Sequence, residues 1–196
     1  MALGEIKAQA MGCKKCKLWL DRKNVVFGSG PLNPQVMLVG EAPGFNEDSQ
    51  GKPFVGSAGK FLDELLLEAG LNREEVYITN VVKCRPPGNR DPEREEMDAC
   101  SIYLAKQIEL LSPKVIITLG RISTFELLWR YNIELNTSSI SKIHGWVIEA
   151  NYVKIVPSYH PAAAIYKNDL KDVLKADFRK IRELLKKSGQ AKLTGF

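Results

Sequence analysis

Four cysteines are the residues of this chain whose types and spacing point most directly to chemistry. Cys13 and Cys16 form a C-x2-C pair, and Cys84 and Cys100 follow with fifteen residues between them. A C-x2-C turn presents two thiolates to one ion, and two more thiolates complete a tetrahedral site. The pattern predicts one metal centre that joins the N-terminal segment to the middle of the chain. Zinc and an iron–sulfur cluster both accept four thiolates, so spacing alone leaves both open.

Several cations flank these cysteines, and their positive field favours thiolates and would offset an anionic cluster. A solvated basic face would give the same pattern, and both readings can hold together. The flanking cations are Lys14, Lys15, Lys17, Lys83 and Arg85.

Composition predicts an intracellular protein with reduced cysteines. The longest apolar runs, such as residues 115–119, are too short to span a bilayer, and residues 1–10 lack the apolar core of a signal peptide. Four cysteines in an intracellular chain argue against disulfides. The net charge of +5 and the pI of about 9.0 favour an anionic partner such as nucleic acid, although a basic solvated surface gives the same balance.

Strand and helix signals alternate along the 196 residues, a length that fits one domain. Alternation of this kind predicts an α/β fold in which a parallel sheet has helices on both faces. The domain is expected over residues 1–187, followed by a disordered tail at 188–196. The predicted strands are residues 36–39, 76–79, 115–119 and 153–156, and the predicted helices begin near Ser57, Asp91 with Pro92, Ile122 and Leu170.

The carboxyl ends of the predicted strands carry the unusual residues. Parallel sheets bind ligands beyond these ends, so the segments are expected to converge. They are residues 40–44 after the first strand, Asn80 after the second, Gly120-Arg121 after the third, and residues 158–161 after the fourth.

Four side chains near this edge could bind or react with a planar ligand. Glu41 lies in a tight Gly/Pro loop, and Asn80 offers a donor beside an acceptor. Phe54 could stack on a base, and His160 precedes a proline at the binding edge. Each also has a plain structural reading as a surface, capping or core residue. His144, the other histidine, lies in a predicted turn and keeps the structural reading.

The stretch Gly56-x-x-Gly59-Lys60 resembles a phosphate-binding loop only in part. Phe54 occupies the position of the first glycine of that motif, and no Ser or Thr follows Lys60. Nucleoside-triphosphate hydrolysis is therefore excluded on this motif.

Together these segments resemble one family, the family 4 (iron–sulfur) uracil-DNA glycosylases, from Cys13 to about residue 185. The motifs that carry the resemblance are Cys13-x2-Cys16, Gly40-Glu41-Ala42-Pro43-Gly44 with Glu47, Pro53-Phe54-Val55-Gly56-x-Ala58-Gly59, Thr79-Asn80-Val81-Val82-Lys83-Cys84-Arg85-Pro86-Pro87, Cys100, and His160-Pro161-Ala162-Ala163.

The resemblance implies a three-layer α/β/α sandwich with a four-stranded parallel sheet. It implies that Cys13, Cys16, Cys84 and Cys100 hold a [4Fe–4S] cluster. The activity would be hydrolysis of the N-glycosidic bond of uracil flipped out of DNA, in double- or single-stranded form. Free uracil and an abasic site would be the products.

The resemblance also assigns roles at the site. Phe54 would stack on uracil, Asn80 would read its O4 and N3–H, and His160 would donate to O2. Backbone N–H groups near Gly40 and Ala42 would assist, and Glu41 would stabilise the sugar cation or position water. Glu47 would wall off C5 and exclude thymine. Better-known uracil glycosylases carry Asp where this chain has Ala42, so the attacking water lacks that carboxylate.

Three other functions are also compatible with the sequence. The chain could be a non-catalytic iron–sulfur protein that binds DNA or senses redox state, a zinc-bound nucleic-acid module, or a related glycosylase with a different base preference. A sliding clamp is a further candidate partner, although no clear motif for it is found. We expect a monomer that associates with the nucleoid and with no membrane.

Overall fold

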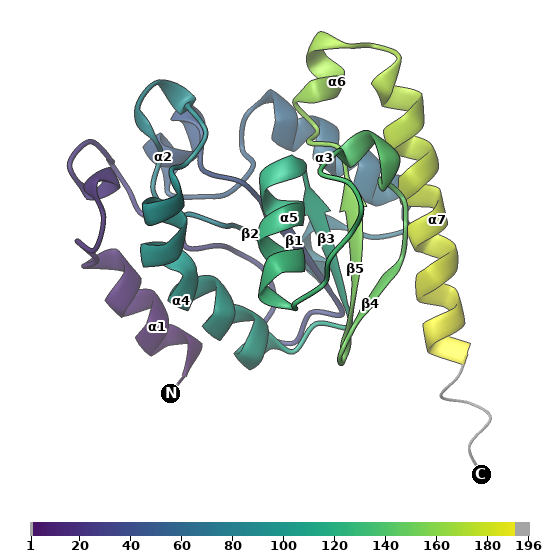
Figure 1. The fold of residues 1–196 in the computed structure, drawn as a ribbon, viewed down its shortest axis with the longest axis horizontal. Helices are drawn as coiled ribbons and strands as arrows, with labels where there is room; N and C mark the ends of the chain where they lie inside the picture. Colours follow the sequence, from purple (N-terminus) through teal and green to yellow (C-terminus); the bar gives the residue numbers. More distant parts are fainter. Residues whose placement is uncertain (1, 191–196) are drawn as a thin grey trace.

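The structure is a computed structural model that describes residues 2–190 and is shown in Figure 1. Its strands are β1 (Val36–Gly40), β2 (Val76–Asn80), β3 (Val115–Leu119), β4 (Ile148–Ala150) and β5 (Val153–Ser158). Its α-helices are α1 (Leu3–Met11), α2 (Phe45–Gln50), α3 (Ser57–Glu68), α4 (Arg94–Leu111), α5 (Arg121–Arg130), α6 (Ala163–Tyr166) and α7 (Leu170–Gln190). Short 3-10 turns are η1 (Lys17–Trp19), η2 (Arg73–Glu75), η3 (Pro87–Asn89) and η4 (Ile140–Lys142).

The strands form one sheet in the order β2-β1-β3-β5-β4, and every pairing is parallel except that of β4 with β5. The four predicted strands and the α/β class are confirmed. Sequence reasoning missed β4, because three residues at the edge carry no clear period. A two-residue turn with Asn151 at φ 54° leads from β4 directly into β5.

Two layers of helices cover the sheet. Alternate residues along each strand point to opposite faces, as the pleat requires. In β1, Met37 and Val39 pack on the side of α1, α4 and α5, whereas Val36 and Leu38 pack on the side of α3 and α7. Figure 1 shows these helices on the two sides of the strands, so the predicted three-layer sandwich is confirmed.

Helix α4 begins later than the sequence signals indicate. The sequence predicts Asp91 as the N-cap, but the N-cap is Glu93, which forms a capping box with Glu96. The Glu96 carboxylate accepts the Glu93 N–H at 2.8 Å and pairs with Arg90 at 2.7 Å. Asp91 instead pairs with Arg121, the first residue of α5, at 3.2 Å.

The C-terminal region extends the last helix beyond the predicted domain end. Helix α7 continues to Gln190, so residues 188–190 of the predicted tail belong to it, and residues 191–196 lie outside the described part of the chain. Among the helices described, none has the length and apolar character needed to cross a bilayer.

Candidate functional site

A pocket of about 470 Å³ opens at the carboxyl edge of the sheet, within the range typical of small-molecule sites. The parallel register places Gly40 beside Asn80, and loops after β1 and β5 close the pocket around them. Of the residues predicted to converge at the strand ends, Asn80 and His160 line the pocket together with Gly44. Gly120 and Arg121 are not in the lining. The lining residues that matter here are Glu47, Phe54, Asn80, Asn89, His160 and Tyr166.

Asn80 presents a buried amide to this pocket. The residue is 1% exposed, and its Oδ1 has no hydrogen-bond partner within residues 2–190. A buried polar atom left unpaired costs about 1–3 kcal/mol, which an incoming N–H donor would recover. The amide thus favours a ligand with a donor placed for Oδ1.

Phe54 forms one wall of the pocket in an unusual backbone conformation. Its φ is +51°, a left-handed value that costs a bulky residue about 1–3 kcal/mol. The ring stacks on His160 with centroids 5.6 Å apart and planes inclined by 27°. A Cβ at Gly40 would lie 2.8 Å from the Phe54 ring and would also collide with Asn80 Oδ1. Only glycine at position 40 lets these two side chains sit together.

His160 is held as a neutral hydrogen-bond donor. Burial lowers the pKa of His160 to about 4 and outweighs the opposing effect of the Glu47 carboxylate. The Ala162 N–H donates to His160 Nδ1 at 3.1 Å. A neutral imidazole that accepts at Nδ1 carries its proton on Nε2. The ring therefore offers one N–H donor at neutral pH. A Cβ at Gly120, whose φ is 101°, would lie only 3.2 Å from the Cβ of His160.

Glu41 lies beside the pocket rather than in its lining. Its carboxyl is half-buried, and burial together with Asp91 raises the pKa of Glu41 to about 7, against the opposing effect of Arg121. Gly40 and Ala42 also lie outside the lining set, and Ala42 packs against the core on the α4 side. A carboxyl that titrates near neutrality can serve as a base or as a charged group in a reaction.

Glu47 lines the pocket with its carboxylate engaged by the backbone. Its Oε1 accepts the N–H groups of Val55 and Gly56 at 2.9 and 3.0 Å, and its Oε2 accepts that of Gly44 at 3.1 Å. These contacts join α2 to the loop that carries Phe54. Glu47 therefore shapes the wall of the pocket whatever else it contacts.

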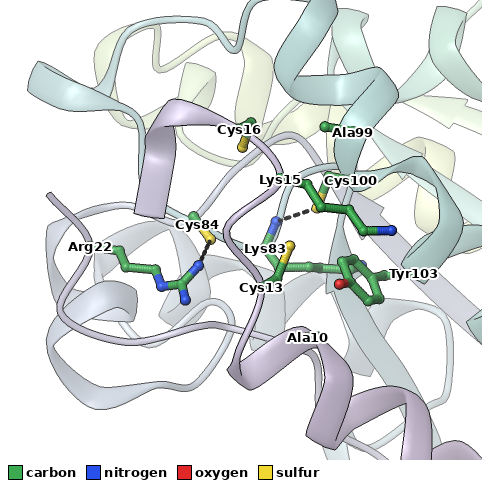
Figure 2. A pocket seen from close by; sticks show the side chains of 10 residues that line it. All are labelled: Ala10, Cys13, Lys15, Cys16, Arg22, Lys83, Cys84, Ala99, Cys100 and Tyr103. Carbon is green, nitrogen blue, oxygen red and sulfur yellow. Dashed lines mark hydrogen bonds between the residues drawn. The ribbon is translucent and has the colours of Figure 1, made fainter. Parts of the chain in front are cut away.

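The four cysteines line a second, separate cavity. Cys13 and Cys16 lie between α1 and η1, Cys84 follows β2, and Cys100 is buried on α4. Figure 2 shows their sulfur atoms around one space. Among residues 2–190, no group of three or more His, Cys, Asp or Glu side chains is arranged to hold one metal ion.

The chemistry of this donor set fits a thiolate-bound centre. Arg22 Nη1 donates to Cys84 Sγ at 3.2 Å, and the Lys83 N–H donates to Cys100 Sγ at 3.3 Å (Figure 2). Hydrogen bonds of this kind stabilise thiolate ligands and tune a metal centre. Burial raises the pKa of the Cys100 thiol to about 11, so a bound cation would have to displace its proton.

Lys83 is not one of the solvated cations predicted around the cysteines. Its side chain is 1% exposed and runs under the end of β2, where Nζ donates to Asn80 O at 2.6 Å. Nζ also donates to Thr79 Oγ1 and Gln107 Oε1, each at 2.7 Å. Burial lowers the pKa of Lys83 to about 7, and three acceptors satisfy its ammonium donors. Lys83 thus contacts both Cys100 and the carboxyl end of β2.

Sequence reasoning missed Asn89 as a member of the pocket lining. Asn89 ends η3 at φ 56°, and its Oδ1 accepts Arg85 Nε at 2.7 Å. The Pro-Pro-Gly-Asn sequence signals a turn, but it does not indicate that the turn folds back over the carboxyl edge. His144, kept as a structural residue, lies outside the lining and pairs with Asp177 at 2.5 Å.

Comparison with known proteins identifies the class. The family model described as uracil DNA glycosylase superfamily matches residues 27–186. The chain therefore belongs to the uracil-DNA glycosylase superfamily.

Individual relatives identify the type-4 branch of this superfamily. The chain is 50% identical over 188 residues to the type-4 uracil-DNA glycosylase of Sulfurisphaera tokodaii, covering 93% of this chain and 84% of the relative. It is 53% identical over 178 residues to that of Saccharolobus solfataricus, covering 88% and 82%. It is 42% identical over 180 residues to that of Thermotoga maritima, covering 90% and 91%. The resemblance to family 4 drawn from the motifs is confirmed.

The glycine at the centre of the pocket provides a direct test of this geometry. Gly40→Ala is expected to lower uracil release by at least 100-fold, because the new methyl group displaces the Phe54 ring or the Asn80 amide. Single-turnover release from a uracil-containing oligonucleotide measures this, with Gly4→Ala as control, since nothing lies within 4 Å of a Cβ at Gly4. Wild-type rates for Gly40→Ala would show that the close approach is not needed.

Proposed function

We propose that this protein is a monofunctional uracil-DNA glycosylase whose pocket at the carboxyl edge of the sheet binds uracil flipped out of DNA. The C1′–N1 bond breaks, the oxygen of water bonds to C1′, and a proton reaches the departing base. Free uracil and an abasic site result, with no strand cleavage. The observation that carries the site assignment is the buried Asn80 Oδ1, which lacks a partner within the described residues.

Base recognition is assigned to Phe54 and Asn80. Flipping costs a few kcal/mol, and stacking on the Phe54 ring recovers part of that cost. Asn80 Oδ1 accepts from N3–H of uracil while its amide N–H₂ donates to O4. Cytosine has the opposite donor and acceptor pattern, so its binding leaves buried groups unpaired and can be disfavoured by about 10⁴ or more.

Glu47 is proposed to bound the pocket near C5 of the base and to exclude the methyl group of thymine. Its position in the lining supports this role. Because the carboxylate is bound by three backbone N–H groups, the wall it forms is rigid.

Bond cleavage is assigned to His160 and Glu41. Negative charge grows on uracil O2 as the bond breaks, and the neutral His160 donates to it from Nε2. Backbone N–H groups near Gly40 and Ala42 are proposed to assist. The Glu41 carboxylate stabilises the positive charge on the sugar or positions the attacking water.

The cysteine cavity is proposed to hold a [4Fe–4S] cluster bound by Cys13, Cys16, Cys84 and Cys100. Four thiols around one space and two N–H donors to sulfur support this. The cluster supplies structural cross-linking when bound, and no cysteine takes part in the proposed cleavage.

Uracil-containing DNA, double- or single-stranded, is the proposed macromolecular partner. Tyr166 on α6 is exposed and lines the pocket, and its neighbour Ile165 is also exposed. One of these two side chains is proposed to fill the vacated base stack. A monomeric state, association with the nucleoid and a sliding-clamp contact remain proposals. Analytical ultracentrifugation and pull-down with a purified clamp would test the first and the last.

Uracil release by the purified protein tests the function and the site together. We expect release of free uracil from a labelled oligonucleotide, with losses of about 10²–10³ in rate for His160→Ala and for Asn80→Ala, the size of one lost oxyanion-type donor. Oligonucleotides that contain thymine, hypoxanthine or xanthine test the base preference of the wild-type protein. The thymine oligonucleotide is also tested with Glu47→Ala. His144→Ala serves as the matched histidine control. Near wild-type release by His160→Ala would remove His160 from the catalytic residues.

The pKa of Glu41 predicts the pH dependence of the reaction. A carboxylate acts only when deprotonated, so kcat/KM is expected to rise tenfold per pH unit below about 7 and to level off above it. Glu41→Gln should lower the rate and abolish this rise. His160 titrates near 4 and does not contribute in the measured range of pH 5–9. If kcat/KM of Glu41→Gln still rises with pH below about 7, the rise belongs to another titrating group.

Iron content tests the cluster. The purified protein is expected to be brown, and Cys16→Ala is expected to lose iron and thermal stability. Iron quantification and thermal unfolding on the same samples measure both. A colourless wild-type protein that contains zinc would contradict the cluster, and an iron-free Cys16→Ala protein with normal stability and uracil release would contradict its structural role.

A further inference from the structure

The backbone of Phe54 is held in its left-handed conformation by contacts from both sides. A bulky side chain at φ +51° persists only when its surroundings impose it. The restraint comes from residues distant in the sequence.

Arg73 holds the carbonyl side of the loop. It lies in η2, just before β2, and its Nη2 donates to Pro53 O at 2.6 Å and to Phe54 O at 2.9 Å. Its Nη1 donates to Asp63 Oδ1 on α3 at 2.8 Å, which orients the guanidinium. The side chain is 27% exposed, so these charge-assisted bonds are partly shielded from water.

Glu47 holds the amide side of the same loop. Its carboxylate accepts the N–H groups of Val55 and Gly56, the two residues that follow Phe54. Helix α3 passes so close that a Cβ at Gly59 would overlap the Phe54 carbonyl. A cation binds the carbonyls and an anion binds the amides, so the peptide groups on both sides of Phe54 are oriented.

The fixed backbone determines where the Phe54 ring stands. The ring lies over Gly40, 2.8 Å from the position of a Cβ there, and stacks on His160. Rotation of φ to the ordinary negative range would redirect the Cα–Cβ bond and carry the ring away from both. Arg73 itself is not in the pocket lining.

We propose that Arg73 is a positioning residue of the base-binding pocket, which acts by holding the Pro53 and Phe54 carbonyls so that the Phe54 ring is ready to stack on the base. This inference rests on the proposed function of the pocket. Lysine cannot replace it fully, because one ammonium lacks the planar fork that reaches two carbonyls and Asp63 together.

Variants at position 73 test this role by single-turnover uracil release. Arg73→Gln is expected to lower the rate about 30-fold and Arg73→Lys about 5- to 10-fold. The matched control is Arg179→Gln, which removes another arginine bound to α3, through Glu68 at 2.8 Å, without touching the loop. That control is expected to stay within twofold of wild type.

A double-mutant cycle separates positioning from general stability. If Arg73 acts through the Phe54 ring, Arg73→Gln in a Phe54→Ala background should cost less than a further threefold, because no ring remains to be placed. The inference would be overturned if the rate losses of Arg73→Gln and Phe54→Ala multiply in the double variant. It would also be overturned if Arg73→Gln alone loses no more activity than Arg179→Gln.

Crystal structures of Arg73→Gln and Arg73→Lys provide a readout that does not depend on activity. Phe54 is expected to leave the left-handed region in Arg73→Gln, with its ring displaced from Gly40. An unchanged Phe54 conformation would overturn the inference even if wild type releases uracil. Absence of uracil release by wild type would instead refute the proposed function, while the Phe54 conformation would still decide whether Arg73 holds the loop.

Discussion

The pairing of β1 with β2 in parallel register is the constraint on which the pocket depends. It places Gly40 directly beside Asn80 at the edge where both strands end. The missing Cβ of Gly40 then creates the space that the Asn80 amide and the Phe54 ring share. A shift of one residue would turn Asn80 to the other face of the sheet and bury its amide among apolar side chains. The shape of this pocket thus depends first on the strand register and on the missing Cβ of Gly40.

The same strand end connects the pocket to the cysteine cavity through Lys83. Its backbone N–H contacts Cys100 Sγ, and its ammonium contacts the carbonyl of Asn80. Gln107, which accepts from Lys83, also donates to Phe27 O at 2.7 Å, so α4 and the N-terminal segment share this network. A cross-link among the cysteines would therefore reach the segment that carries the Asn80 amide through Lys83.

Much of this arrangement could be predicted from the sequence, because short apolar runs and strand-end polar residues obey local rules. The convergence of Asn80 and His160 followed from the rule for parallel sheets, and the shared cysteine cavity followed from ligand spacing. Other features depend on contacts between distant residues. The left-handed Phe54 requires Arg73 and Glu47, and the burial of Lys83 requires Gln107 on α4. The edge strand β4 is too short for a periodic signal.

The two edge strands of the sheet, β2 and β4, bear on whether the sheet can pair edge to edge with another copy. At one side, Ser29 exchanges two backbone hydrogen bonds with Ile78, at 3.0 and 2.8 Å, and covers part of β2. At the other side, β4 offers only three residues. Long rows of unpaired N–H and C=O groups are what let sheets join edge to edge into aggregates. With one margin partly capped and the other cut short, this fold offers little template for such growth.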